Sequence, residues 1–121
     1  MSIKKLFITI ILFGVSDLSA QYSLDDYDKL RNSCLSGKGK HCFVLSELFL
    51  IGNSDNRPDK YESVKYSKLS CKRNYGKGCF ILASGYVSGE ALPRSKHSAD
   101  KYFKKACTLE YKKACTKYPS K

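Results

Sequence analysis

The six cysteines of this 121-residue chain are the residues most clearly arranged for chemistry, because they form three pairs with one spacing. The members of each pair lie eight residues apart, and the pairs recur after 37 and then 36 residues. In an exported chain of this size such cysteines oxidise to disulfides. Structural zinc instead requires cysteines about two to four residues apart, with suitably placed histidines. The two histidines fall at unrelated points of the period, so the spacing predicts no metal site and three disulfides: Cys34–Cys42, Cys71–Cys79 and Cys107–Cys115.

The first twenty residues have the composition of an export signal. Lys4 and Lys5 give a positive start, residues 6–15 form an apolar run, and small residues precede Gln21. A run of ten residues reaches only about half of the ~30 Å hydrocarbon core, so an uncleaved anchor is disfavoured. Gln21 also stands where a lipoprotein would need its lipid-accepting cysteine. We therefore expect a cleaved signal peptide over residues 1–20, no membrane span in the mature chain, and a periplasmic or secreted protein.

The chain is strongly basic, with 22 Lys and Arg against 11 Asp and Glu and a net charge of +11. Removing residues 1–20 takes away two lysines and one aspartate, so the mature charge becomes +10. Such a field favours acidic ligands. Lysines dispersed over solvent-facing surfaces also serve solubility, and both interpretations stay open. No basic block or nucleic-acid motif accompanies the charge, so we expect no nucleic-acid partner.

Residues of one kind recur at equal distances from the cysteine pairs, which predicts one structural unit used about three times. The recurring positions in the first two copies are Gly39 and Gly76, Leu45 and Leu82, Phe49 and Tyr86, and Gly52 and Gly89. A third, shorter copy shares the tyrosine that precedes the first cysteine by five residues, at Tyr66 and Tyr102. The apolar positions have the spacing of one helical face. We expect Gly52 and Gly89 to end their helices in left-handed caps.

Helix-capping residues divide each copy into two helices. Asp59 and Ser95 each lie twelve residues before a first cysteine, and Ser23 opens the first copy. Glu62 follows Asp59 by three residues, which predicts a capping box. Six helices are predicted, over residues 23–36, 40–51, 59–73, 77–88, 95–109 and 111–118.

Each disulfide then joins two antiparallel helices across a short loop and contributes about 2.5 kcal/mol in the loop-entropy model. The predicted fold class is all-α, an α-solenoid of about three disulfide-stapled αα-hairpins. We expect a single repeat domain over residues 21–121, with repeat units at approximately 23–58, 59–94 and 95–121.

These motifs carry a family resemblance. Residues 66–71 (YSKLSC) and 102–107 (YFKKAC) end one helix of the unit, and residues 78–83 (GCFILA) begin its partner. The pattern resembles the Sel-one-like repeat, a relative of the tetratricopeptide repeat, in the cysteine-stapled form of the Helicobacter cysteine-rich proteins. The resemblance implies an exported right-handed α-solenoid with one disulfide per repeat. It also implies weak β-lactamase or penicillin-binding activity.

Only one segment of the expected mature chain matches the Ser-x-x-Lys element of serine β-lactamases, at Ser98 and Lys101. In that element the serine attacks the lactam and the lysine accepts its proton. About two such matches arise by chance in a chain so rich in serine and lysine, and a second one lies inside the signal at Ser2 and Lys5. Ser98 also stands at a helix-capping position. Ser98 and Lys101 are therefore weak catalytic candidates, and whether the chain is an enzyme stays open.

We expect a binding or adaptor module for a peptide, a protein or a peptidoglycan fragment, with an acidic ligand favoured by the charge. The alternative, implied by the resemblance, is a weak β-lactamase or penicillin-binding hydrolase that takes a β-lactam. A secreted structural or host-interaction protein is a third hypothesis that the residues do not separate from the first. We expect no cofactor and a monomer.

Overall fold

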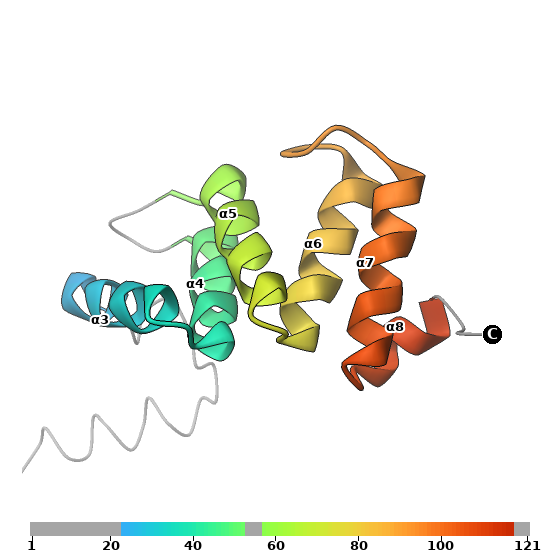
Figure 1. The fold of residues 1–121 in the computed structure, drawn as a ribbon. Coiled ribbons are helices and arrows are strands. Elements are labelled where there is room, and N and C mark those ends of the chain that lie inside the picture. Colours follow the sequence, from blue (N-terminus) through green and yellow to red (C-terminus); the bar gives the residue numbers. More distant parts are fainter. Residues whose placement is uncertain (1–22, 53–56, 118–121) are drawn as a thin grey trace, which may run out of the picture.

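The computed structural model describes residues 23–52 and 57–117, which form a row of α-helices (Figure 1). Within these ranges the structure contains no strand, and the helices are α3 (Leu24–Leu35), α4 (Gly39–Ile51), α5 (Lys60–Lys72), α6 (Gly76–Ser88), α7 (Lys96–Thr108) and α8 (Lys112–Lys117). The predicted all-α class and the hairpin repeat are confirmed, and each predicted helix differs from its observed counterpart by no more than one residue at either end. None of the described helices combines the length and apolar character that a membrane span requires. The signal peptide expected over residues 1–20 lies outside the described residues.

The predicted capping residues begin three of the helices. The side chains of Ser23, Asp59 and Ser95 accept hydrogen bonds from backbone N–H groups in the first turns of α3, α5 and α7. The capping box predicted for Asp59 and Glu62 is wrong. The N–H of Asp59 donates to the carbonyl of Phe49 at 2.7 Å, so it is not available to the Glu62 carboxylate. Glu62 lies instead 3.7 Å from the ammonium of Lys65.

The two helix-ending glycines adopt different conformations. Gly89 has φ 70° and ψ 15°, which is the predicted left-handed cap. Gly52 has φ 76° but ψ 178°, so a left-handed cap is wrong at this position. Pro58 lies against this glycine, and its nitrogen would lie 2.6 Å from a Cβ on residue 52. Glycine is required there both by the positive φ and by this close approach.

Three disulfides close the hairpins α3–α4, α5–α6 and α7–α8: Cys34–Cys42, Cys71–Cys79 and Cys107–Cys115, with Cα–Cα distances of 4.7, 4.4 and 4.7 Å. The turn inside each bridge is built in the same way. The third residue after the first cysteine has a positive φ in every copy: Gly37 at 119°, Asn74 at 62° and Glu110 at 68°. One backbone turn is therefore used three times, although only its first copy has glycine at the position that favours it.

Repeat-equivalent aromatic rings join one hairpin to the next. Phe49 of α4 stacks on Tyr66 of α5, with centroids 5.6 Å apart and planes 4° from parallel. Tyr86 of α6 stacks in the same way on Tyr102 of α7, at 5.8 Å and 5°. The recurring aromatic positions seen in the sequence thus meet one another across both interfaces between hairpins.

A second pair of rings repeats as well. Phe43 lies 5.5 Å from Tyr75, and the equivalent Phe80 lies 5.2 Å from Tyr111. The two tyrosines were not singled out in the sequence, although both follow a first cysteine by four residues. The first copy has Lys38 at this position, which is why a comparison of the first two copies does not reveal it.

The helices pack unevenly, and this leaves a groove on one side of the row. Each helix packs against its neighbours in the chain, and α4 also contacts α6. The backbones of α5 and α7 stay further apart than those of α4 and α6. Buried side chains from the inward faces form two clusters, one around α3 to α5 and one around α5 to α8, and the first two disulfides lie within them.

Candidate functional site

A hollow in the described part of the chain runs along α5, on the side that faces α7. It consists of two adjoining depressions of about 470 and 370 Å³, which share Lys68 and Lys72. We call this surface the basic groove. Its polar and aromatic side chains are five lysines and two tyrosines: Tyr61, Lys65, Lys68, Lys72, Lys101, Tyr102 and Lys105.

Helical spacing places these lysines in the groove. Lys65, Lys68 and Lys72 follow each other after three and four residues, so they lie along one face of α5. Lys101 and Lys105 are four residues apart on α7. The opposite face of α5 is buried and consists largely of small residues and Tyr66. Sequence analysis missed the groove lysines as a group, since their shared spacing on α5 is visible but their meeting with α7 is not.

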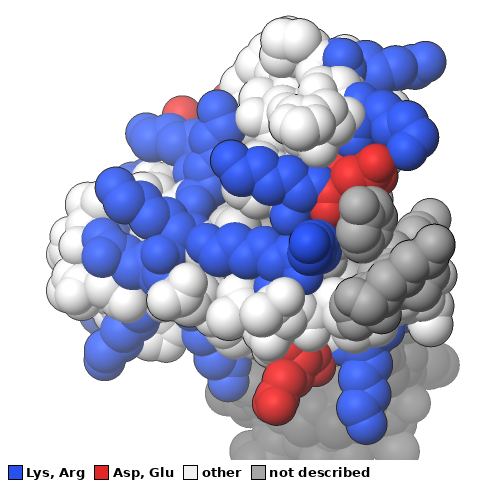
Figure 2. Space-filling model, turned by 45° about the vertical axis from the view of Figure 1, so that its right-hand side comes forward, with Lys and Arg blue, Asp and Glu red and all other residues white. Residues whose placement is uncertain are grey.

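The groove is electropositive because none of its described lining residues is acidic. Among the described contacts, Lys65 alone of the five lysines forms an ion pair, with Glu62 at 3.7 Å. The ammonium groups of Lys65 and Lys101 occupy equivalent places over neighbouring tyrosine rings, 5.4 and 5.3 Å from the centroids. Unpaired cations in a hollow concentrate anionic ligands near the surface. Figure 2 shows how densely Lys and Arg side chains cover one face of the molecule.

Two further contacts hold the helices that border the groove. The ammonium of Lys105 donates to the carbonyl of Cys71 at 2.9 Å and so caps the C-terminal end of α5. At the other side of α5, Arg31 donates to the hydroxyl of Tyr66 at 3.1 Å and to Asp28 at 2.7 Å. The hydrogen bond to Tyr66 raises the pKa of Arg31 above its ordinary value. The basic side chains therefore also connect one hairpin to the next.

Both weak catalytic candidates lie on α7. Ser98 lies in the first turn of α7, where its N–H donates to the hydroxyl of Ser95 at 3.1 Å. Lys101 is exposed, with its ammonium over the ring of Tyr102. No hydrogen bond between the side chains of Ser98 and Lys101 occurs in the described part of the chain, whereas an activated serine needs its base within reach. The described residues also contain no group of three His, Cys, Asp or Glu side chains that could hold a metal ion.

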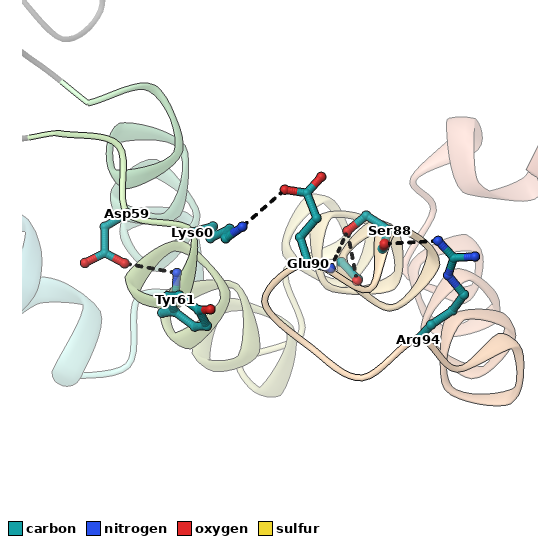
Figure 3. Close-up of polar contacts among 7 residues, drawn as sticks. Asp59, Lys60, Tyr61, Ser88, Glu90 and Arg94 are labelled. Atoms are coloured by element: carbon teal, nitrogen blue, oxygen red, sulfur yellow. Dashed lines mark hydrogen bonds and ion pairs between the residues drawn. The ribbon is translucent and has the colours of Figure 1, made fainter.

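A smaller apolar hollow of about 250 Å³ adjoins the basic groove near the start of α5. We call it the apolar pocket. Leu50, Val64, Ile81, Gly85 and Ala91 provide its apolar lining. At its rim the ammonium of Lys60 lies 3.5 Å from the carboxylate of Glu90, and Figure 3 shows this pair reaching from α5 to the chain that follows α6.

The segment that follows α6 separates the two hollows. Ala91 lines both of them, and Leu92 is buried in the core beside Gly85. Two hydrogen bonds hold the ends of this segment. The N–H of Ser95 donates to the backbone carbonyl of Tyr86, and the guanidinium of Arg94 donates to the backbone carbonyl of Ser88 (Figure 3). Leu92 gave no repeating signal in the sequence, because the first copy has a different linker.

Neither a protein family nor a curated protein matches the sequence. Solved structures do match. Helicobacter pylori cysteine rich protein B is 26% identical, with a TM-score of 0.73 over 87% of this chain and 77% of its own. A Sel1 repeat protein from Oxalobacter formigenes has a TM-score of 0.65 at 18% identity, over 75% of this chain and 68% of its own.

A third solved structure is a protective antigen present in uropathogenic Escherichia coli strains, which displays an SLR fold. It matches with a TM-score of 0.65 at 22% identity over 73% of this chain, but the match spans only 19% of the antigen. These two more distant structures share the fold. The chain therefore has the Sel1-like repeat fold, with each of its three hairpins closed by a disulfide.

Proposed function

We propose that this protein is a binding module that holds an extended acidic peptide in the basic groove. The observation that carries the proposal is the set of five lysines along two adjoining hollows whose described lining contains no acid. Repeat proteins of stacked helix pairs bind extended ligands on such surfaces. The long hollow suits an elongated chain better than a compact ligand.

The chemistry of the groove favours carboxylates. Ammonium groups attract carboxylates as point charges and place weak demands on geometry. Exposed charge pairs are worth about 0.2–1 kcal/mol each, so several of them are needed for measurable affinity. A peptide with repeated Asp or Glu supplies them, and so do the carboxylates of peptidoglycan stem peptides. The exposed ring of Tyr61 at one end of the groove adds an apolar contact.

The proposed setting is the periplasm or the cell exterior, reached after removal of residues 1–20. Three disulfides are typical of an oxidising compartment, and the first 20 residues have the composition of an export signal. We propose that residues 21–121 form one monomeric repeat domain there.

Charge reversal tests the groove. The probe is a fluorescein-labelled peptide of six glutamates flanked by glycines, followed by anisotropy against the oxidised protein at 20 and 200 mM salt. Lys68→Glu with Lys72→Glu should weaken binding at low salt by about ten-fold or more, since two attractive contacts become repulsive. Lys112→Glu with Lys113→Glu, exposed on α8 and outside the groove, makes the same change in net charge. Equal losses in both double variants, or binding that salt does not weaken, would refute the proposal.

A second experiment with cell-wall material distinguishes acidic protein segments from peptidoglycan stem peptides as the source of the carboxylates. Purified peptidoglycan is sedimented with the same proteins, and the retained fraction is measured. Retention that is lost in the Lys68 and Lys72 variant but kept in the α8 variant assigns the groove to stem peptides. Peptide binding without retention assigns it to acidic protein segments.

A further inference from the structure

We infer that the apolar pocket binds one leucine-sized aliphatic side chain of the peptide whose acidic residues lie in the basic groove. The inference rests on the proposed function for the charge of the peptide, and it adds a side-chain specificity that charge alone does not supply. It starts from the pocket lining. Leu50 of α4, Val64 of α5 and Ile81 of α6 converge there from three helices of two successive hairpins.

The lining favours an aliphatic group. Its polar members are already engaged: the hydroxyl of Ser84 donates to the carbonyl of Phe80 at 2.9 Å, and that of Ser63 hydrogen-bonds with Ser46 at 3.1 Å. Ser88 donates in the same way to the carbonyl of Gly85 at 3.2 Å. The serines therefore offer little to a polar ligand, and apart from the Lys60–Glu90 pair at the rim the surface left for contact is apolar.

The size of the pocket limits the occupant to one side chain. Its volume of about 250 Å³ lies below the range of about 300–1,000 Å³ that is typical of drug-sized ligands. It exceeds the roughly 150 Å³ of an engineered apolar cavity that binds benzene. A single branched aliphatic side chain fits between these limits, whereas a whole extended peptide does not.

Position connects the pocket to the basic groove. Val64 and Ala91 line both hollows, so a chain lying along Lys65 and Lys68 passes directly beside the pocket. Glu90 stands at the pocket rim, where its carboxylate pairs with Lys60 (Figure 3). An acidic residue at that rim would meet Glu90, whereas farther along α5 the charged side chains that line the basic groove are all lysines. The arrangement therefore favours an uncharged aliphatic residue at the pocket, followed by acidic residues along α5.

Two labelled peptides test the specificity: Gly-Leu-Gly-Glu-Glu-Glu and Gly-Ala-Gly-Glu-Glu-Glu, measured by anisotropy against the oxidised protein. The leucine peptide should bind about ten-fold more tightly, which is the ratio expected when roughly half of the additional side chain leaves water. Equal affinities would overturn the inference while leaving the charge-based proposal intact.

Filling the pocket supplies a second readout. Ser84→Leu should remove the preference for the leucine peptide over the alanine peptide. Thr108→Leu is the matched control, because Thr108 makes the same type of bond to a carbonyl four residues earlier but is exposed and outside both hollows. Gly85→Ala places one methyl group at the pocket without a steric clash, since the nearest atoms lie 3.4 and 3.7 Å away, and should reduce the preference partly. A preference that survives in a folded Ser84→Leu variant contradicts the inference.

The apolar pocket can also be tested with a peptide that has no acidic side chains to bind the groove lysines. The neutral peptide Gly-Leu-Gly at millimolar concentration should shift the methyl resonances of Val64 and Ile81, and Gly-Ala-Gly should not. Shifts with Gly-Leu-Gly but no binding of any acidic peptide would retain the pocket and refute the charged groove. If Gly-Leu-Gly causes no shifts, the inferred binding of leucine in the apolar pocket is wrong. It is also wrong if the free protein forms dimers that Ser84→Leu abolishes, because the pocket would then be occupied by a second copy of the protein.

Discussion

Two glycines of α6, seven residues apart, should respond in opposite ways to the same substitution. Gly78 is buried where α6 crosses α5, and a Cβ at this position would overlap both the Oγ and the Cβ of Ser70. Gly85 faces the apolar pocket, where a Cβ would make only ordinary contacts. Replacing each glycine with alanine therefore adds one methyl group to the same helix in two different steric environments.

The expected magnitudes follow from three contributions. Alanine stabilises a helix by about 0.5–1 kcal/mol relative to glycine at both positions. At position 78, overpacking costs about 1–3 kcal/mol. Displacement of Ser70 also weakens its 2.8 Å hydrogen bond to the carbonyl of Gly39, at about 1 kcal/mol. The net expectation is a loss of about 2 kcal/mol for Gly78→Ala and a gain of about 0.5–1 kcal/mol for Gly85→Ala.

Urea unfolding of the oxidised proteins, followed by far-ultraviolet circular dichroism, measures both changes. With a denaturant dependence of about 1–3 kcal/mol per molar, Gly78→Ala should lower the midpoint by about 1 M, and Gly85→Ala should raise it. Adding Ser70→Ala to Gly78→Ala should not restore stability, because the Cβ of residue 70 is itself part of the overlap. Equal midpoints for the two single variants would refute the close crossing of α5 and α6.

Three further outcomes test the fold and the alternative chemistry. Glu110→Gly should raise the unfolding free energy by about 1 kcal/mol, since Glu110 has φ 68° in the left-handed region that glycine tolerates; Glu110→Ala should give no such gain in the same urea titration. Replacing both Cys107 and Cys115 with alanine should lower the free energy of unfolding by about 2.5 kcal/mol. Replacing Cys71 and Cys79, which are more deeply buried, should lower it further. A larger loss of stability for the Cys107 and Cys115 variant would contradict the observed packing. The oxidised protein should not hydrolyse nitrocefin, because Ser98 and Lys101 are not hydrogen-bonded; turnover that Ser98→Ala abolishes would establish the catalytic alternative.

The repeat explains why so much of the fold could be predicted from the sequence. Cysteine spacing, capping residues and recurring apolar positions are local signals, and each of them appears two or three times at equal distances. Tyr66 and Tyr102 illustrate this, because both stack on the ring of the preceding helix. The errors arose where a non-local contact replaced a local one. The carbonyl of Phe49 accepts a hydrogen bond from the N–H of Asp59 that a capping box would have used, and Pro58 lies too close to Gly52 for a Cβ there.

The candidate site could not be predicted in the same way, because part of it lies where the copies differ. Lys65 and Lys101 are equivalent and lie over equivalent rings. Lys72, however, corresponds to Thr108, and Lys105 corresponds to Leu69. A lysine that no other copy contains contributes nothing to the repeat pattern, yet it determines the charge of the groove between two copies.

The same argument applies to the segment between α6 and α7. Leu92 anchors this segment in the core, and the segment separates the apolar pocket from the basic groove. Stability in a solenoid comes from contacts that neighbouring units make alike, so residues that depart from the pattern are free to serve a ligand. In this chain Lys72 and Lys105 of the basic groove and the segment that carries Leu92 are such departures, which is the physical reason to look for binding there rather than at the repeated geometry of the disulfide turns.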